Sequence, residues 1–456
     1  MGNQTVKKTL TKTSKMTLST SDFTEHLPQE LCKKVLTYLG PTDLASFSQC
    51  CVRWREMANI NPLWLHHCMV RHWLKFGLHT DILHEETLYP KASNVSGTSP
   101  TFSLQIPEGS KLSPICKWKH IYVCVCHLHT NWARGRYTVS PIFRGHKEKV
   151  TAMDCDNHCI VSGSEDKALR VWDIHSTTCI HTINCHSDTV TAVKLKNNMI
   201  VTGCADSSIR VLNSSSGKLC FSLQGHSGSV DHIQLSGDKI ISAGTDKTVR
   251  IWSIKDRKLL CILRGHTDEI ECLSNVGSYA LTGSWDNTLM LWDVEKGRLL
   301  FQLSGHTEVI SCCQFDSEKI VSGSADKDLR IWSMSSGKCT HILSGHDGEV
   351  YCLAYNKEVI ASGCSDSAVI IWNLAGELLH KQRQHLGIVR CIHLNDDRLV
   401  TGGDQKKLVV WDYRSGQVLN CIHRHPTLLH LIKVCDLRLV TASPEKPGTI
   451  TVLSYW

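Results

Sequence analysis

The sequence predicts a mainly β protein built from a repeated unit, with a helical segment ahead of the repeats. Histidines recur with a period of 40 residues and one step of 39, and periods in this range are typical of solenoids and propellers. Each histidine is followed at constant distances by the same few residue types. Ahead of the first repeat, apolar residues follow helical spacing. The recurring residues are His146, His186, His226, His266, His306, His346, His385 and His425.

The fifth repeat carries the full set of spaced residues. Ser322 stands 16 residues after His306, Asp326 stands 20 after it and Trp332 stands 26 after it. We predict a structural relay in which the Trp N–H donates to the Ser hydroxyl, the hydroxyl bonds the His ring, and the Asp fixes the ring. Each buried bond contributes about 0.5–1.5 kcal/mol net, but a member left unpaired costs more.

This pattern resembles the WD-repeat family over residues 136–456. The resemblance implies a β-propeller of four-stranded blades. The segment Tyr137–Phe143 precedes the first repeat, and Thr449–Leu453 is the third strand of the last one. The first segment therefore fits as the missing fourth strand of the final blade, which pairs otherwise open edges. The expected fold is an eight-bladed propeller.

Three repeats depart from the pattern, and we expect their blades to open more easily, the eighth most of all. Leu212 replaces Trp in the second repeat, and Gln405 replaces Asp in the seventh. The eighth has Glu445 for Asp, Leu453 for Trp and a two-residue insertion between Pro444 and Gly448.

The composition indicates in which cellular compartment the protein resides and which classes of partner are not expected. No apolar run approaches the roughly 20 residues that span a bilayer, and the N-terminus lacks the apolar core of a secretion signal. The 23 cysteines without such a signal predict a reducing compartment, cytoplasmic and/or nuclear. The net charge of +7 is mild and comes largely from residues 1–21, expected to be a disordered basic tail. Neither nucleic acid nor a membrane is therefore expected as a partner.

Residues 22–66 predict three short helices. Leu27-Pro28 opens the first, Gly40-Pro41 ends it, and Asn61-Pro62 begins the third. The apolar positions are Leu31, Val35, Leu36 and Leu39 on one face, and Leu44, Phe47, Cys51 and Trp54 on a second. A unit this small cannot bury all of its leucines by itself.

The same segment resembles an F-box in its Leu-Pro, Leu-Gly-Pro-x-Asp-Leu, Trp-Arg-Glu and Leu-Trp pieces. The resemblance implies that the leftover apolar surface binds a Skp-type adaptor and, through it, a cullin. The adaptor contacts that it implies are Leu27, Pro28, Leu31, Leu36, Leu39 and Trp54. The alternative is a helical cap whose apolar faces pack internally.

Residues 67–135 are expected to link the two parts. Helix continues through 67–80, residues 81–115 are rich in Ser, Thr, Pro and Gly and predict a loop, and Trp118, Tyr122 and Val125 predict a further helix. This arrangement resembles the helical linker of F-box/WD-repeat proteins, which implies a rigid spacer. Cys124, Cys126, His127 and His129 are dense enough to consider zinc, but a second spaced pair of ligands is lacking. We expect no metal and no cofactor.

The repeats resemble an eight-bladed branch of F-box/WD-repeat proteins that reads phosphorylated degrons through arginines at two offsets. The two offsets are five residues after the repeat His and one residue before the turn Asp. At these offsets Arg390 is the one side chain that carries a permanent positive charge, so phosphodegron specificity is not carried over. Acids and aromatics stand there instead and suit a Lys/Arg-bearing or apolar peptide. The candidate substrate contacts are Glu165, Asp231, Glu271, Trp285, Tyr351 and Arg390. The alternative is that these are ordinary loop residues.

The predicted function is the substrate receptor of an SCF-type cullin–RING ubiquitin ligase, with the F-box on the adaptor and the propeller on a degron. Its contribution is proximity rather than bond chemistry. No phosphate loop and no nucleophile motif is found in the sequence, so we expect no catalytic residue. The alternative is a non-degradative WD-repeat scaffold whose helical unit is a dimerisation cap, and a homodimer stays open. The substrate is not predicted.

Overall fold

The computed structural model describes residues 24, 27–76, 115–395, 398–404, 407–422, 431–435, 437–443 and 446–455. The predictions for the tail 1–21, for nearly all of the loop 81–115, and for His425, His430, Gln405, Pro444 and Glu445 lie outside the described residues. The chain divides into two compact units, Met1–Cys126 and His127–Trp456. Within the described part, no helix is both long and apolar enough to cross a bilayer.

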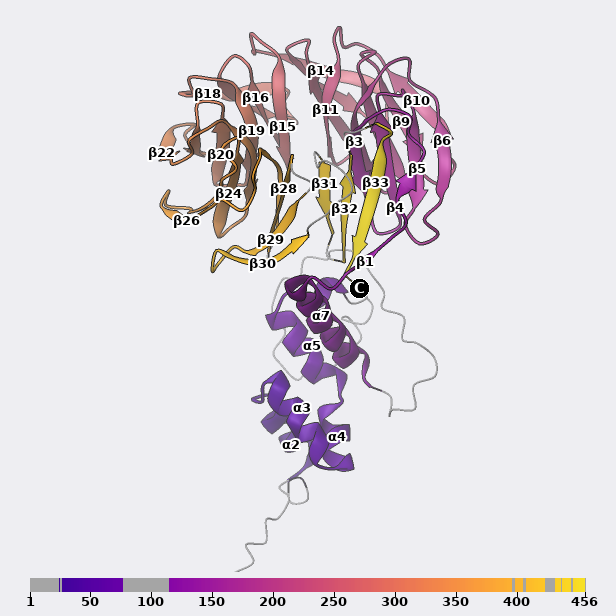
Figure 1. Ribbon diagram of the computed structural model, residues 1–456, viewed down its shortest axis with the longest axis vertical. Helices are drawn as coiled ribbons and strands as arrows, with labels where there is room; N and C mark the ends of the chain where they lie inside the picture. The colour runs from indigo at the N-terminus through magenta and orange to yellow at the C-terminus, as the bar shows by residue number, and fades with distance from the viewer. Residues whose placement is uncertain are drawn as a thin grey trace, which may run out of the picture. The chain divides into compact units, whose positions relative to one another are not determined.

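The first unit is helical (Figure 1). Its elements are α2 (Gln29–Leu36), α3 (Pro41–Cys50), α4 (Val52–Ala58), α5 (Asn61–Val70), the 3₁₀ turn η1 (Trp73–Phe76) and the start of α7 (Lys117–Arg134). The sequence predicted that the first helix ends at Gly40-Pro41, and α2 ends at Leu36. Gly40 is extended and Pro41 begins α3, because proline has no N–H to lose in a first turn. The helix predicted over residues 67–80 ends at Val70, and η1 follows.

The sequence predicted one second helix, and this is wrong in one respect: the structure divides that helix into α3 and α4. Cys51 has extended backbone angles (φ −153°, ψ 169°), and its Sγ accepts the Trp54 N–H, which caps α4. Phe47 and Trp54 therefore do not share one helical face. They meet across the break, with ring centroids 4.3 Å apart and nearly parallel.

Two asparagines cap the N-terminus of α7 from a distant part of the chain. The Asn59 side chain accepts the Cys116 N–H at 2.8 Å, and the Asn61 side chain accepts the Trp118 N–H at 3.2 Å. These N–H groups have no partner within their own helix, so the caps stabilise α7. Trp118 is buried, and Tyr122 packs edge-on against Trp64.

The second unit is an eight-bladed propeller, as the sequence predicted. Blade 1 consists of β3 (Val150–Cys155), β4 (Cys159–Ser164), β5 (Leu169–Asp173) and β6 (Cys179–Ile183), and blade 2 of β7 (Val190–Lys196), β8 (Met199–Cys204), β9 (Ile209–Asn213) and β10 (Leu219–Leu223). Blade 3 consists of β11 (Val230–Ser236), β12 (Lys239–Gly244), β13 (Thr248–Ser253) and β14 (Lys258–Arg264), and blade 4 of β15 (Ile270–Val276), β16 (Tyr279–Ser284), β17 (Thr288–Asp293) and β18 (Arg298–Ser304). Blade 5 consists of β19 (Ile310–Phe315), β20 (Lys319–Ser324), β21 (Asp328–Ser333) and β22 (Cys339–Ser344), and blade 6 of β23 (Val350–Tyr355), β24 (Val359–Cys364), β25 (Val369–Asn373) and β26 (Leu378–Gln382). Blade 7 consists of β27 (Val389–Leu394), β28 (Leu399–Gly403), β29 (Leu408–Asp412) and β30 (Gln417–Ile422), and blade 8 of β31 (Leu431–Val434), β32 (Arg438–Ala442) and β33 (Thr449–Ser454), completed by β1 (Thr138–Val139) and β2 (Phe143–Arg144).

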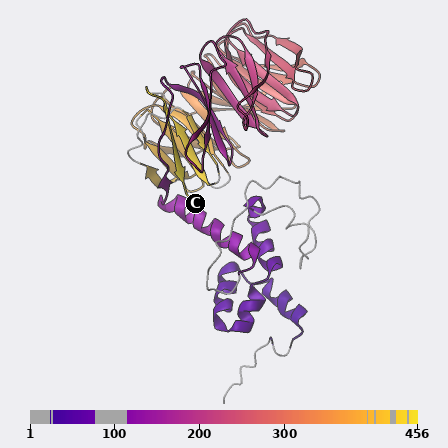
Figure 2. The same cartoon turned by 90° about the vertical axis from the view of Figure 1, so that its right-hand side faces the viewer.

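The ring closes in the predicted way. Both β1 and β2 pair antiparallel with β33, with Thr138 opposite Ser454 and Phe143 opposite Ile450. Pro141 lies between the two short strands and has no N–H to give to the ladder. Figure 1 shows the yellow strands of blade 8 beside the magenta strands of blade 1, and Figure 2 shows the sheets of this unit one behind another.

Apolar side chains between neighbouring blades form the core of the propeller. One cluster joins Val249 and Ile251 of blade 3 to Leu273 and Trp292 of blade 4. Another joins Val440 and Ile450 of blade 8 to Met153 and Trp172 of blade 1. Each of these blades therefore buries the apolar face of its sheet against the next one, which is how a propeller stabilises its ring.

Candidate functional site

The relay residues of blade 5 form one continuous hydrogen-bonded chain. The Trp332 Nε1–H donates to Ser322 Oγ at 2.9 Å, and Ser322 Oγ lies 2.8 Å from His306 Nε2. His306 Nδ1 lies 2.7 Å from Asp326 Oδ2. The same chain is present in blades 1, 3 and 4.

The Asp of each relay also builds the turn after its strand. Lys327, the residue after Asp326, has a left-handed backbone (φ 73°), which costs a non-glycine residue roughly 1–2 kcal/mol. Asp326 offsets this cost by accepting the N–H of Asp328 at 3.0 Å and that of Thr307 at 3.2 Å. Burial raises the pKa of the Asp326 carboxyl, but the hydrogen bonds from His306 and these N–H groups outweigh it and hold the pKa below its usual range.

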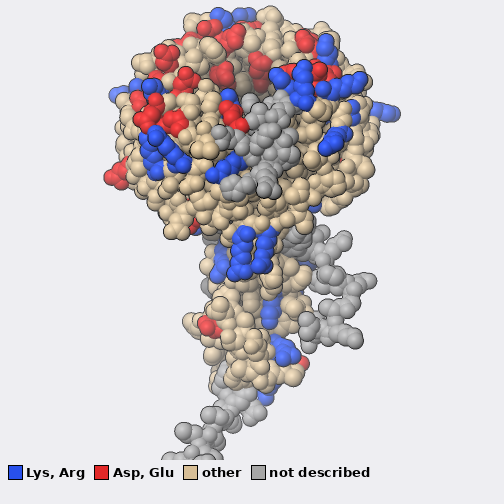
Figure 3. Space-filling view, viewed as in Figure 1, with Lys and Arg blue, Asp and Glu red and all other residues tan. Residues whose placement is uncertain are grey.

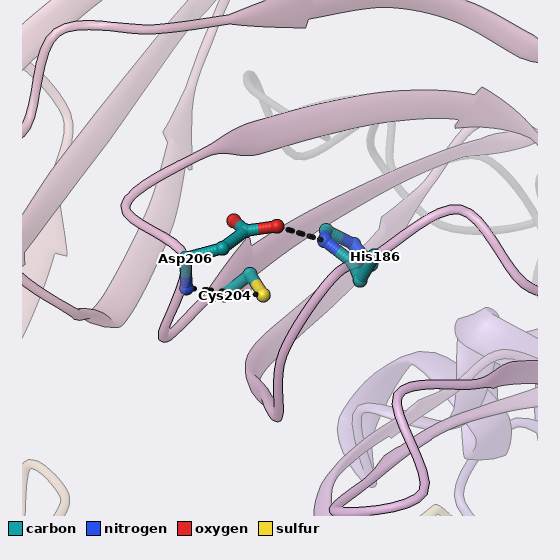
Figure 4. Close-up of side chains that lie close together, drawn as sticks. All are labelled: His186, Cys204 and Asp206. Carbon is teal, nitrogen blue, oxygen red and sulfur yellow. Dashed lines mark hydrogen bonds and ion pairs between the residues drawn. The ribbon is translucent and has the colours of Figure 1, made fainter.

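Blades 2 and 6 break the relay between the His and the Asp. His186 Nδ1 and Asp206 Oδ2 are 3.9 Å apart in blade 2, and His346 Nδ1 and Asp366 Oδ1 are 3.9 Å apart in blade 6. In both blades a cysteine, Cys204 or Cys364, stands two residues before the Asp, where blades 1, 4 and 5 have serine. Figure 4 shows the blade 2 group, with dashed lines from the Asp206 carboxylate to the His186 ring and from the Asp206 N–H to the Cys204 sulfur.

Leu212 marked blade 2 as a departure at the Trp position, but the repeat pattern predicted the His–Asp break in neither blade, and in blade 6 all four relay residues are present. Cys364, which stands where blades 1, 4 and 5 have serine, is the sequence feature that could have indicated the broken His346–Asp366 bond. The Trp372 Nε1–H still donates to Ser362 Oγ at 3.0 Å, and His346 Nε2 lies 2.7 Å from that oxygen. Burial lowers the pKa of His346 to about 4.

The α2 helix presents an exposed apolar stripe. Leu27, Leu31 and Val35 are 39%, 48% and 44% exposed at a spacing of four residues, and Tyr38 follows at 82%. Pro28 is also exposed, whereas Leu39 and Trp54 are half-buried. Val35 and Tyr38 are not among the predicted adaptor contacts, although their helical spacing from Leu31 was a usable signal.

Leu36 is a correction to the predicted adaptor contacts. It is fully buried together with Cys32, one turn earlier on α2. Leu31 and Leu36 were predicted to share one helical face. An α-helix has about 3.6 residues per turn, so a residue five positions along lies well past one full turn, and the two side chains point in different directions. Leu36 therefore belongs to the core of the first unit, and the exposed stripe runs beside it.

The candidate substrate residues fall into two bonded groups and two separate residues. Trp285 is 52% exposed, and its Nε1–H donates to Glu271 at 2.8 Å. The Arg390 guanidinium lies 5.4 Å from the Tyr351 ring centroid. Asp231 accepts from Ser229 at 2.5 Å, and Glu165 lies 3.5 Å from Lys149.

Arg390 is already paired within the chain. Its Nε donates to Asp404 at 2.8 Å, and this hydrogen bond raises the pKa of Arg390 further. Tyr351 donates its hydroxyl proton to Glu349 at 3.0 Å. Asp404 and Glu349 are not among the predicted substrate contacts, and both add negative charge. Figure 3 shows acidic side chains gathered over the upper part of the second unit in that view.

The dense Cys/His group on α7 has neighbours within its own helix. Cys124 Sγ lies 3.6 Å from His120 Nε2, and burial raises the pKa of both Cys124 and Cys126. Within the described ranges, the two groups of His, Cys and Asp close enough to share a metal ion are instead the relay groups of blades 2 and 6.

Two protein-family models match the chain. The model described as F-box-like matches residues 24–70. The model described as WD domain, G-beta repeat matches seven stretches that together make up more than half of the chain: 138–173, 177–213, 217–253, 257–293, 297–333, 337–373 and 376–412. The strands β31–β33 of blade 8 lie outside these matches, in keeping with the departures of the eighth repeat from the pattern, whereas β1 and β2 lie within the first matched stretch.

Several curated proteins are similar over about a third of the chain. A probable E3 ubiquitin ligase complex SCF subunit sconB from Arthroderma otae is 28% identical over 36% of this chain and 24% of its own length. An F-box protein of Saccharomyces cerevisiae is 27% identical over 34% of this chain and 23% of its own length. The F-box/WD repeat-containing protein 7 of Drosophila melanogaster is 29% identical over 36% of this chain and 11% of its own length. The matches thus span a quarter or less of these relatives.

A solved structure supports the propeller. The computationally designed Ika8 protein is 27% identical and covers 68% of this chain and 97% of its own, with a TM-score of 0.64.

Proposed function

The chain belongs to the F-box/WD-repeat family, and from this premise we propose that it is the substrate-recognition subunit of an SCF-type ubiquitin ligase. Its F-box binds a Skp-type adaptor and, through it, a cullin, while its propeller binds a protein substrate. The relatives whose names describe SCF subunits support this role. In this proposal the receptor positions its substrate and makes or breaks no bond itself.

The exposed stripe of α2 carries the proposal. Leu27, Leu31, Val35 and Tyr38 are large apolar side chains that their own unit leaves in solvent. Contiguous exposed apolar side chains on a small helical unit are typical of an interaction surface. Spacing of four residues also suits packing of a partner helix against α2.

Co-purification with a Skp-type adaptor tests the proposal. The variant Leu27→Ala/Leu31→Ala should weaken binding about 30- to 1,000-fold, because each leucine contributes on the order of 1–2 kcal/mol when it is buried. Val70→Glu is the matched control, since Val70 is 64% exposed on α5, away from the stripe. If the wild-type chain captures no adaptor, the scaffold function replaces the ligase function.

We further propose that the propeller binds a substrate segment with basic or aromatic side chains. Trp285 offers an exposed ring. Asp231 and Glu271 are the second residues of β11 and β15, and Glu349 directly precedes β23, so these three carboxylates stand at the start of the first strand of their blades. Arg390 is neutralised by Asp404, so a phosphate dianion would find little unpaired positive charge among these residues. Cations favour aromatic faces and carboxylates together.

Peptide binding measured on Trp285→Ala and Asp231→Arg tests this substrate class. Both variants should weaken the binding of a lysine-rich peptide, and Asp231→Arg should lose more at low salt than at high salt because charge screening removes its effect. Lys357→Ala, on a turn between β23 and β24 at the other end of the strands, is the control. Unchanged affinity in both variants would mean that these are ordinary loop residues.

A further inference from the structure

Blade 6 contains a buried imidazole nitrogen that the relay leaves unsatisfied. His346 Nδ1 has no hydrogen-bond partner among the described residues, and the His346 side chain is 0% exposed. In blade 5 the corresponding atom bonds Asp326 at 2.7 Å. A buried polar atom without a partner is costly, so the gap around His346 Nδ1 calls for an occupant.

Blade 2 has the same three residue types and fills its gap with an arginine. Arg210 hydrogen-bonds His186 Nδ1 and lies 3.2 Å from Asp206 Oδ2. Both Arg210 and Ile370 stand 24 residues after their relay histidines. Ile370 is fully buried and apolar, so blade 6 receives no cation from this position.

We propose that His346, Cys364 and Asp366 bind one divalent transition-metal ion of the zinc class. One ligand atom from each residue lies within 4.8 Å of the others. Tetrahedral zinc with bonds of about 2.0–2.3 Å places its ligands roughly 3.3–3.8 Å apart, so the three atoms need to approach by about 1 Å. Nitrogen, sulfur and oxygen ligands together suit this class of metal.

Charge balance favours the ion in blade 6 over blade 2. On binding, the Cys364 thiol releases its proton to solvent, and the thiolate and the Asp366 carboxylate together neutralise a divalent cation. In blade 2 the Arg210 cation already neutralises Asp206, and a metal would have to displace it. Arg383 also approaches the blade 6 group, but its Nη2 lies 3.5 Å from Oδ2 of Asp366 and bonds Asp347 at 2.5 Å.

Hydrogen bonds already hold the ligands in place. Ser362 fixes the far nitrogen of His346 at 2.7 Å, which leaves Nδ1 directed toward Asp366. Asp366 Oδ1 accepts the Ala368 N–H at 2.8 Å and keeps a lone pair for the ion. Groups that orient ligands in this way raise metal affinity.

The competing explanation is that Cys364 only replaces a serine. Its Sγ accepts the Asp366 N–H at 3.4 Å, as Ser324 Oγ accepts the Asp326 N–H at 3.1 Å in blade 5. The two explanations differ for Cys364→Ser. This variant recreates the blade 5 arrangement, so it should fold and restore the bond between His346 and Asp366, but it should not bind the metal.

The test uses chelator-treated full-length chain and Co²⁺ as the probe. The wild type should show the near-ultraviolet charge-transfer absorption of a cobalt–thiolate bond, Cys364→Ser should lose it, and Cys204→Ser should keep it. Ile370→Arg, which copies blade 2, should lose it as well. Absence of the band in the wild type, or its full retention in Cys364→Ser and Ile370→Arg, would overturn the proposal.

Discussion

Removal of one hydroxyl tests the relay of blade 5. Ser322→Ala leaves two buried groups without their partner, the Trp332 Nε1–H and His306 Nε2, which lie 2.9 Å and 2.8 Å from Ser322 Oγ. Each buried polar group left unpaired costs about 1–3 kcal/mol, so the two groups together should cost blade 5 roughly 2–6 kcal/mol of local stability. The control is Thr202→Ala in blade 2, where Leu212 replaces the Trp. This substitution removes the His186 bond at 2.7 Å and a longer bond to the Arg210 carbonyl at 3.3 Å, but it leaves no indole N–H unpaired. We expect that control to cost about half as much.

Native-state hydrogen exchange of the β19–β22 amides measures this loss, because exchange reports the free energy of local opening. A loss of about 2–6 kcal/mol corresponds to exchange that is roughly 30- to 25,000-fold faster, at about 1.36 kcal/mol for each factor of ten. The β7–β10 amides report Thr202→Ala in the same way. Equal effects of the two substitutions, or an effect of Ser322→Ala no larger than that of an exposed Ser336→Ala, would contradict the relay.

Three further predictions follow from single contacts. Burial lowers the pKa of His385 to about 4 from 6.5; the unfolded chain therefore binds more protons below pH 6.5, and stability of blade 7 should fall as pH drops from 6.5 to 4, seen as faster exchange of the β27–β30 amides. An increase in the stability of blade 7 as pH drops from 6.5 to 4 would refute burial as the cause of the lowered His385 pKa. The ring of Tyr455 stacks on Trp132 with centroids 3.5 Å apart, while its buried hydroxyl has no hydrogen-bond partner among the described residues; Tyr455→Phe should keep or raise the unfolding midpoint, and Tyr455→Ala should cost about 3–5 kcal/mol. A clear decrease in the unfolding midpoint of Tyr455→Phe would show that the Tyr455 hydroxyl has a hydrogen-bond partner. Asn59→Ala and Asn61→Ala should each cost about 0.5–2 kcal/mol as lost caps of α7, measured by exchange of the Lys117–Cys126 amides, with no change expected at β19–β22.

The helical unit shows what its apolar pattern could and could not determine. Gly40-Pro41 predicted that the first helix ends before α3, because proline restricts its own backbone and that of the residue before it. The pattern could not separate Leu31 from Leu36, since both are apolar and five residues apart. Only packing decided that Leu36 is buried while Leu31 stays 48% exposed. In the same way, the break at Cys51 depends on the contact between Phe47 and Trp54 across it.

The sequence by itself determined the ring. Eight repeats of one period and a strand-like segment ahead of the first repeat predicted eight blades, because each repeat supplies the strands of one blade and the segment ahead completes the last one. Only the tertiary structure decided the state of each relay. Blade 6 has all four residues, yet a thiol in place of a hydroxyl accompanies a His346–Asp366 separation of 3.9 Å. The larger sulfur atom and the neighbouring side chains at positions 210 and 370 act through space, which spacing along the chain does not encode.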